Sequence, residues 1–226
     1  MFDSIRNLFA KPDDRREPAV QAVRPSPYGQ ENVDLVYNLL FCDDPSIFRS
    51  AQDQGGPWQL VLRSESDPSA VTRLAEDESQ ESRLRCLAFN WLRKNNHPVP
   101  TRRLLGSIVE IGLDNGLDTL AVFKDGRVRY INHTGKMAVL ETAPLDVATA
   151  GEDLLAASQP VVDSIGRWDK LRCPPPPKGS VRMTFLVSDG LYFGEAPIAV
   201  MDRDPLGGPV YHAAARVLQA IVAAAP

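Results

Sequence analysis

The 226-residue sequence has little of several features that commonly specify a function. Its three cysteines, Cys42, Cys86 and Cys173, lie far apart, and none belongs to a C-x-x-C pair. This pattern argues against a disulfide framework and against a structural zinc site, so no metal is expected. Because Cys42 and Cys86 stand among apolar residues, we expect both to be core side chains.

Lysine is scarce, and long apolar runs are missing. Six of the 25 basic residues are lysines, no basic run forms a stripe, and the formal net charge is −4. Nucleic-acid binding usually needs clustered Lys and Arg to replace phosphate counterions, so no nucleic-acid partner is expected. No stretch approaches the ~18 apolar residues of a membrane-spanning helix. Residues 1–10 also lack the pattern of a signal peptide. We therefore expect a cytoplasmic protein without a membrane span.

The N-terminal residues differ in composition from the rest. A short amphipathic helix is predicted over residues 1–10, with its apolar side formed by Phe2, Ile5, Leu8 and Phe9. Residues 11–31 are rich in charge and proline and predict a flexible tether. The helix has two possible docking places, the protein's own body and a partner, and we favour the body.

Residues 32–98 predict a β-α-β-α block. Apolar and polar residues alternate over 33–41 and again over 58–63, the period of a strand. Asp44–Pro45 and Asp67–Pro68 each place a capping residue before a proline, which is a helix start signal. The second helical segment is expected to be interrupted near Ser79.

The signals for secondary structure are clearest between residues 104 and 141. Asn115–Gly116, Asp125–Gly126 and the stretch from Asn132 to Gly135 are turn signals between strand-like segments. They predict a four-stranded antiparallel meander with tips at 115–116, 125–126 and 133–135.

A helix, a hairpin and a final helix are expected to follow. The helix should bend or break within one turn of Pro160, with Leu154 and Ile165 both buried. A hairpin is predicted around Asp189–Gly190, and the last helix is predicted to start at Pro209. The fold class is therefore α+β: a mainly antiparallel sheet with helices packed on one face, preceded by the β-α-β-α block. Residues 32–98 and 99–226 are expected to form one continuous globular body.

Four residues are the candidates for chemistry: Glu110, Asp118, His133 and Lys136. For His133 we favour a turn residue, because Asn132 and Gly135 explain the turn and an exposed tip gives the imidazole no fixed partner. Glu110 is either an acid on a half-buried surface or a residue of the solvent face, and we favour the solvent face. No nucleophile, phosphate-loop or dinucleotide-binding motif is present, so no cofactor is expected.

Two functional hypotheses remain. In the first, the chain is a cytoplasmic protein-binding protein of the adaptor or chaperone kind, without intrinsic catalysis. Its partner would be another protein, bound through the N-terminal helix or a sheet edge, and a homodimer is possible. From Ser69 onward the order α-βββ(β)-α-ββ-α resembles that of the small acidic secretion-chaperone fold, whose members dimerise and hold extended segments of partners. In the second, Glu110, Asp118, His133 and Lys136 assemble an enzyme site from distant positions.

Overall fold

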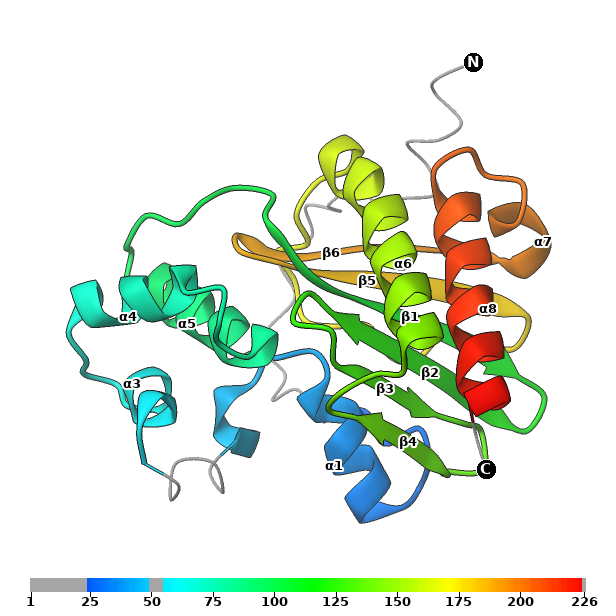
Figure 1. Ribbon diagram of the computed structural model, residues 1–226, viewed down its shortest axis with the longest axis horizontal. Coiled ribbons are helices and arrows are strands. Elements are labelled where there is room, and N and C mark those ends of the chain that lie inside the picture. The colour runs from blue at the N-terminus through cyan, green and yellow to red at the C-terminus, as the bar shows by residue number, and fades with distance from the viewer. Residues whose placement is uncertain (1–23, 49–54, 225–226) are drawn as a thin grey trace.

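The computed structural model describes residues 24–48 and 55–224 (Figure 1). Its centre is a six-stranded sheet in the order β4-β3-β2-β1-β5-β6, in which all neighbouring strands are antiparallel. The predicted α+β class and antiparallel sheet are therefore confirmed. The strands are β1 (Leu104–Leu113), β2 (Gly116–Phe123), β3 (Val128–Ile131), β4 (Met137–Leu140), β5 (Ser180–Val187) and β6 (Gly190–Pro197). The helices are α1 (Glu31–Leu39), the 3-10 helix η2 (Pro45–Phe48), α3 (Pro57–Leu62), α4 (Pro68–Glu76), α5 (Ser82–Lys94), α6 (Leu145–Ser164), α7 (Ile198–Met201) and α8 (Gly207–Ala224).

The predicted meander is present as β1 to β4. Leu113 pairs with Gly116, so the first tip is at 114–115, one residue before the predicted position. At the third tip the side-chain Oδ1 of Asn132 accepts hydrogen bonds from the backbone N–H groups of Thr134 and Lys136, each at 3.0 Å. Gly135 has φ +84° there, the left-handed conformation that the turn requires.

The first block is helical, so the predicted β-α-β-α order is wrong. The alternating residues at 33–41 and 58–63 form α1 and α3 instead of strands. In α1 the buried apolar side chains are Val33 and Tyr37, four positions apart, while Leu35 between them is 44% exposed. Apolar residues at every second position satisfy a strand and also supply the i, i+4 pairs of a helix. The expected break near Ser79 is correct, because α4 ends at Glu76 and α5 begins at Ser82.

Helices cover both faces of the sheet, which corrects the expectation of one covered face. Figure 1 shows α6 and α8 side by side in front of the sheet. One hydrophobic cluster joins these helices to side chains such as Val109 and Val122. A second cluster joins α1 and α5 to Ile108 and Ala121, whose side chains point to the other face. The face of Ile108 and Ala121, called the second face below, is thus covered by α1, which was expected to be a strand, and by α5, which was expected to be a helix.

Helix α6 runs without a break from Leu145 to Ser164 and contains Pro160 four residues before its end. Of the predicted bend or break, the break is therefore absent, and the bend stays a prediction. Leu154 is fully buried and Ile165 is 8% exposed, as expected. Pro160 has no N–H to donate to the Ala156 carbonyl, so the helix continues past this position with one backbone hydrogen bond fewer. Helix α8 begins at Gly207, two residues before the predicted Pro209, because Asp204 Oδ1 accepts the Gly207 N–H at 2.6 Å.

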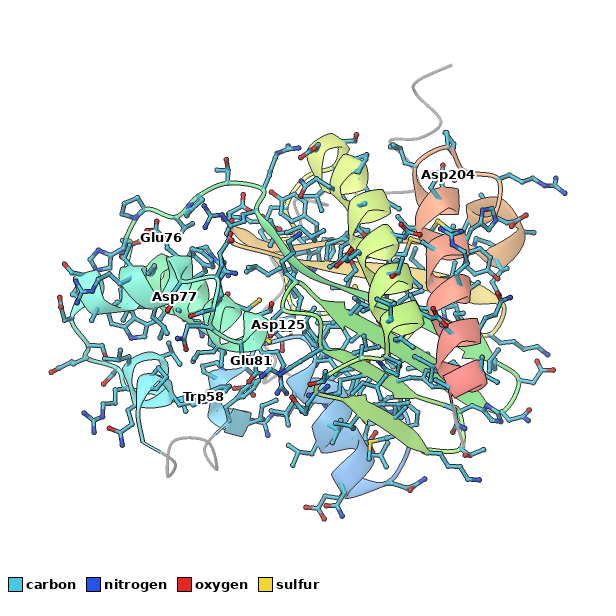
Figure 2. The ribbon with its side chains drawn as sticks, in the orientation of Figure 1. Trp58, Glu76, Asp77, Glu81, Asp125 and Asp204 are labelled. Carbon is cyan, nitrogen blue, oxygen red and sulfur yellow. The ribbon has the colours of Figure 1, made fainter. Side chains whose placement is uncertain are left out.

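Helix α5 is fixed to the sheet by the tip between β2 and β3. Asp125 Oδ2 accepts the backbone N–H of Ser82 at 2.7 Å, and the Ser82 hydroxyl accepts the backbone N–H of Asp125 at 3.0 Å (Figure 2). The figure labels Asp125 and Glu81 beside one another where the first turn of α5 meets this tip. Asp125 thereby acts as an N-terminal cap for a helix distant in sequence.

Two irregular segments also lie on the second face. The described part of the predicted tether is packed there, because Asp34 accepts the Tyr28 N–H at 2.9 Å and the Tyr28 hydroxyl donates to Thr119 at 2.8 Å. The tether prediction is therefore wrong for residues 24–31, whereas 11–23 and the predicted helix over 1–10 lie outside the described residues. The second segment joins α6 to β5, and its Cys173 carbonyl accepts a hydrogen bond from Arg182 at 3.2 Å.

Candidate functional site

The four residues suggested for an enzyme do not converge. Glu110 pairs with Thr119 in the sheet, and Asp118 pairs with Ile111, so their side chains point to opposite faces. Asp118 and His133 do meet, whereas Lys136 is exposed in the turn before β4. Asp118 lines a small cavity between the sheet and α8, together with Tyr130 and Tyr211.

His133 is a turn residue, but its imidazole has a fixed neighbour. Asp118 Oδ1 accepts the backbone N–H of His133 at 2.7 Å and lies 3.3 Å from His133 Nδ1. The other oxygen of Asp118 accepts the Tyr130 hydroxyl at 2.8 Å. The expectation that the ring has no fixed partner is therefore wrong. The carboxylate holds the turn against β2, and no hydroxyl or thiol nucleophile is hydrogen-bonded to the imidazole among the described residues.

Glu110 is fully buried, so the preferred solvent-face interpretation is wrong. Its Oε1 accepts the Tyr37 hydroxyl at 2.7 Å, while Oε2 has no hydrogen-bond partner among the described residues. Burial raises the pKa of Glu110 above its ordinary value, although the hydrogen bond from Tyr37 and the positive charges of Arg182 and Arg172 oppose this. The second face of the sheet therefore carries a buried carboxyl group, one oxygen of which accepts no hydrogen bond from the described residues.

We expect Glu110→Gln to weaken the dependence of stability on pH. Because the folded-state pKa is raised, the folded protein binds more protons than the unfolded chain above about pH 4.3, the ordinary carboxyl pKa. The free energy of unfolding should therefore fall as the pH rises from about 4.3 through the folded-state pKa. Glutamine does not titrate, so Glu110→Gln removes this contribution to the pH dependence. Urea unfolding between about pH 4 and pH 8 measures it. The exposed Glu152→Gln is the control, and equal slopes in both variants would contradict the prediction.

Sequence reasoning missed the arginines that surround this carboxyl group. The Arg172 guanidinium lies 3.8 Å from the ring centroid of Phe41, and its Nε is 3.2 Å from Asp43 Oδ2. Arg182 on β5 donates from Nε to Glu195 Oε2 at 2.8 Å. An arginine in the middle of an apolar strand, as in VRMTFLV, is the signal that identifies Arg182 as a buried charge with a partner.

The outer strand β4 exposes apolar side chains, and we call Met137–Leu140 the β4 edge. Met137 is 43% exposed and Val139 is 52% exposed, and both lie on the sheet face that carries buried Ile131. On the other face Ala138 and Leu140 pack partly against the core. A short, accessible strand with apolar side chains is a surface that can accept another strand.

The backbone of the β4 edge is also free to pair. The N–H of Asn132 donates to the Lys136 carbonyl at 2.9 Å, so Asn132 and Lys136 form a hydrogen-bonded pair. In an antiparallel ladder every second pair is hydrogen-bonded, so the next such pairs between β3 and β4 are Tyr130 with Ala138 and Val128 with Leu140. Ala138 and Leu140 therefore turn their backbone groups toward β3. Met137 and Val139 turn theirs outward, where no strand of the described residues pairs with them.

Neither a metal cluster nor a membrane span defines a site in the described ranges 24–48 and 55–224. No group of three or more His, Cys, Asp and Glu side chains is placed to hold a metal ion there. None of the helices there combines the length and apolar character needed to cross a bilayer. In the comparisons with known proteins, no family model, no curated protein and no solved structure matches the chain.

Proposed function

We propose that the chain is a protein-binding protein of the adaptor kind, without intrinsic catalysis, and that its partner adds an extended strand to the β4 edge. The observation that carries the proposal is the coincidence of free backbone groups and exposed apolar side chains at Met137 and Val139. In strand addition the backbone hydrogen bonds supply affinity, and alternate side chains supply specificity.

The position of the β4 edge supports this role. The N-terminal end of α1 lies beside the turn that precedes β4, since Gln30 Nε2 donates to the Thr134 carbonyl at 3.3 Å. A strand added to β4 would extend the sheet face that α1 covers. Leu35 of α1 is 44% exposed, so this side of the molecule already presents apolar surface.

The enzyme hypothesis receives less support from the same geometry. Its residues are divided between the two faces of the sheet, and the carboxyl group of Glu110 is sealed from solvent. A general base must reach the proton that it abstracts from a substrate. The hydrogen-bonded oxygen of Glu110 is occupied by the hydroxyl of Tyr37.

Substituting Val139 with lysine is expected to abolish strand addition, because a charge on an edge strand opposes pairing. The probe is a set of fluorescently labelled ten-residue peptides with alternating apolar and polar residues, titrated against the full chain by fluorescence polarisation. We expect at least one peptide to bind, and Val139→Lys to weaken that binding at least about tenfold. Val139 is 52% exposed, so the fold should tolerate the change.

The matched control is Val222→Lys, the same change at a 70% exposed valine near the end of α8. It should leave peptide binding unchanged. Failure of every peptide to bind, or equal binding by Val139→Lys and the wild type, would overturn the proposal. Sedimentation of the chain alone tests whether a second copy occupies the β4 edge. If the wild type self-associates and Val139→Lys does not, the β4 edge is a homodimer interface and the adaptor proposal is overturned.

A further inference from the structure

A cleft beside α5 gathers basic side chains from distant parts of the sequence. It has a volume of about 390 Å³ and lies between α5, the segment after α6 and the tip between β5 and β6. We call it the arginine cleft; the lining residues used below are Asn90, Arg93, Lys94, Arg167, Trp168 and Asp189. This volume is within the range of ~300–1,000 Å³ usual for small-molecule sites.

Helix geometry places the first group of polar side chains on one wall of the arginine cleft. Asn90, Arg93 and Lys94 are three and four positions apart, so they share one face of α5. Arg93 Nη1 donates to the Ser188 carbonyl at 2.7 Å, and its Nη2 donates to Asn90 Oδ1. Arg93 is therefore held in place through uncharged acceptors.

Arg167 comes from the opposite wall. Its aliphatic part lies across Gly190, where a Cβ atom would be only 2.6 Å from Arg167 Cδ, and its Nη1 donates to the Asp189 carbonyl at 3.2 Å. Gly190 therefore gives Arg167 the space to extend along the tip. Burial lowers the pKa of Arg93 and the charge of Arg167 adds to this, whereas the Asp189 carboxylate opposes it, so the two guanidinium groups and this carboxylate lie in the same region.

Three aspartates line the arginine cleft, Asp43, Asp169 and Asp189, and Asp43 and Asp189 are each held by contacts with other residues. Asp189 accepts the Tyr192 hydroxyl at 3.0 Å and the Arg102 backbone N–H at 3.3 Å. Asp43 forms its ion pair with Arg172. Within residues 24–48 and 55–224, neither Arg93 nor Arg167 forms an ion pair with a carboxylate. The lining carries four basic and three acidic side chains, and the guanidinium groups of Arg93 and Arg167 are hydrogen-bonded to neutral acceptors, so their positive charges favour an anion.

We propose that the arginine cleft binds a small phosphate-bearing molecule, with its phosphate group between Arg93 and Arg167. Guanidinium groups present planar pairs of N–H donors that match phosphate oxygens. Lys94 adds a further positive charge at the rim. Trp168 forms a side wall and is fixed there, because its indole N–H donates to the Leu171 carbonyl at 2.9 Å and its ring packs edge-on at 4.6 Å from that of Phe193. The remaining volume accommodates an organic group attached to the phosphate.

The test is isothermal titration calorimetry of the full chain at constant ionic strength in a phosphate-free buffer. The probes are inorganic phosphate, adenosine 5′-monophosphate, adenosine and succinate. We expect the two phosphate-bearing probes to bind and adenosine and succinate to bind at least about tenfold more weakly. Arg167→Gln should weaken binding of the phosphate-bearing probes at least about tenfold, and Arg167→Lys should restore part of it.

The matched control is Arg216→Gln, which removes an arginine from α8, outside the arginine cleft, and should leave phosphate binding unchanged. Equal losses in Arg167→Gln and Arg216→Gln, or no binding of a phosphate-bearing probe below about 10 mM, would overturn the proposal. Stronger binding of succinate than of phosphate would assign the site to carboxylates instead. The proposal does not depend on the β4 edge, so Val139→Lys should bind the phosphate probes normally.

Discussion

Gly112→Ala is expected to destabilise the protein by about 3 kcal/mol, the upper part of the range for overpacking. Gly112 lies in β1, and a Cβ atom there would be 2.2 Å from the Pro177 carbonyl oxygen and 2.8 Å from that of Pro176. Both neighbours are backbone atoms of the proline-rich segment, so no side-chain rotation relieves the contact. The segment would have to lift from the sheet and lose the hydrogen bond from the Gly179 N–H to the Gly112 carbonyl, which is 2.8 Å long.

The expected loss of stability in Gly112→Ala is opposite to the usual effect of such a substitution. Replacing a strand glycine with alanine ordinarily favours folding, because alanine loses less backbone entropy. Gly166→Ala is the control, since nothing lies within 4 Å of a Cβ atom at that position. It should be neutral or stabilising by up to ~1 kcal/mol. Chemical unfolding of both variants gives the comparison, and a Gly112→Ala variant as stable as Gly166→Ala would show that the segment is loosely packed.

Local turn chemistry explains why the meander could be predicted. The signals at Asn115–Gly116, Asp125–Gly126 and Gly135 act within four residues, and they require no knowledge of the rest of the chain. Each also separates two strand-like segments, so the strand order β1 to β4 follows from short antiparallel connections.

The first block was less predictable because its periodicity is ambiguous. Apolar residues at 33, 35, 37, 39 and 41 occupy every second position, and this set contains the i, i+4 pair Val33 and Tyr37. The buried Asp34 decides in favour of the helix, since its carboxylate accepts hydrogen bonds from the segment that precedes α1. That contact is visible only after folding.

The candidate sites depend on contacts between distant segments. Arg93 and Lys94 are adjacent in the sequence, but Arg167 reaches them only because the segment after α6 returns beside α5. The burial of Glu110 likewise depends on which elements cover the second face, and strand alternation alone does not supply that information. The sequence therefore predicts turns and strands better than it predicts charged clusters.

Tyr37→Ala is expected to have the largest effect on stability, about 4 kcal/mol or more. Tyr37 is fully buried and packs edge-on against Tyr28 and Phe41, with ring centroids 5.9 and 5.2 Å away. Removing a buried aromatic ring costs ~3–5 kcal/mol. The lost hydroxyl would also leave both oxygens of Glu110 without a partner, which costs a further ~1–3 kcal/mol. Because total stabilities are ~5–15 kcal/mol, much of the chain should be unfolded at 37 °C.

A double-mutant cycle separates the ring from its hydroxyl. Tyr37→Phe keeps the ring and should cost ~1–3 kcal/mol, because Glu110 then stays buried without a hydrogen bond. Combining Tyr37→Phe with Glu110→Met removes the polar group as well, so the double variant should be more stable than the two single losses together predict. Urea unfolding of the four proteins at pH 7 gives the coupling energy. Additive losses would mean that the hydroxyl and the carboxyl group do not stabilise one another, and the whole effect of Tyr37→Ala would then come from the cavity that the ring leaves.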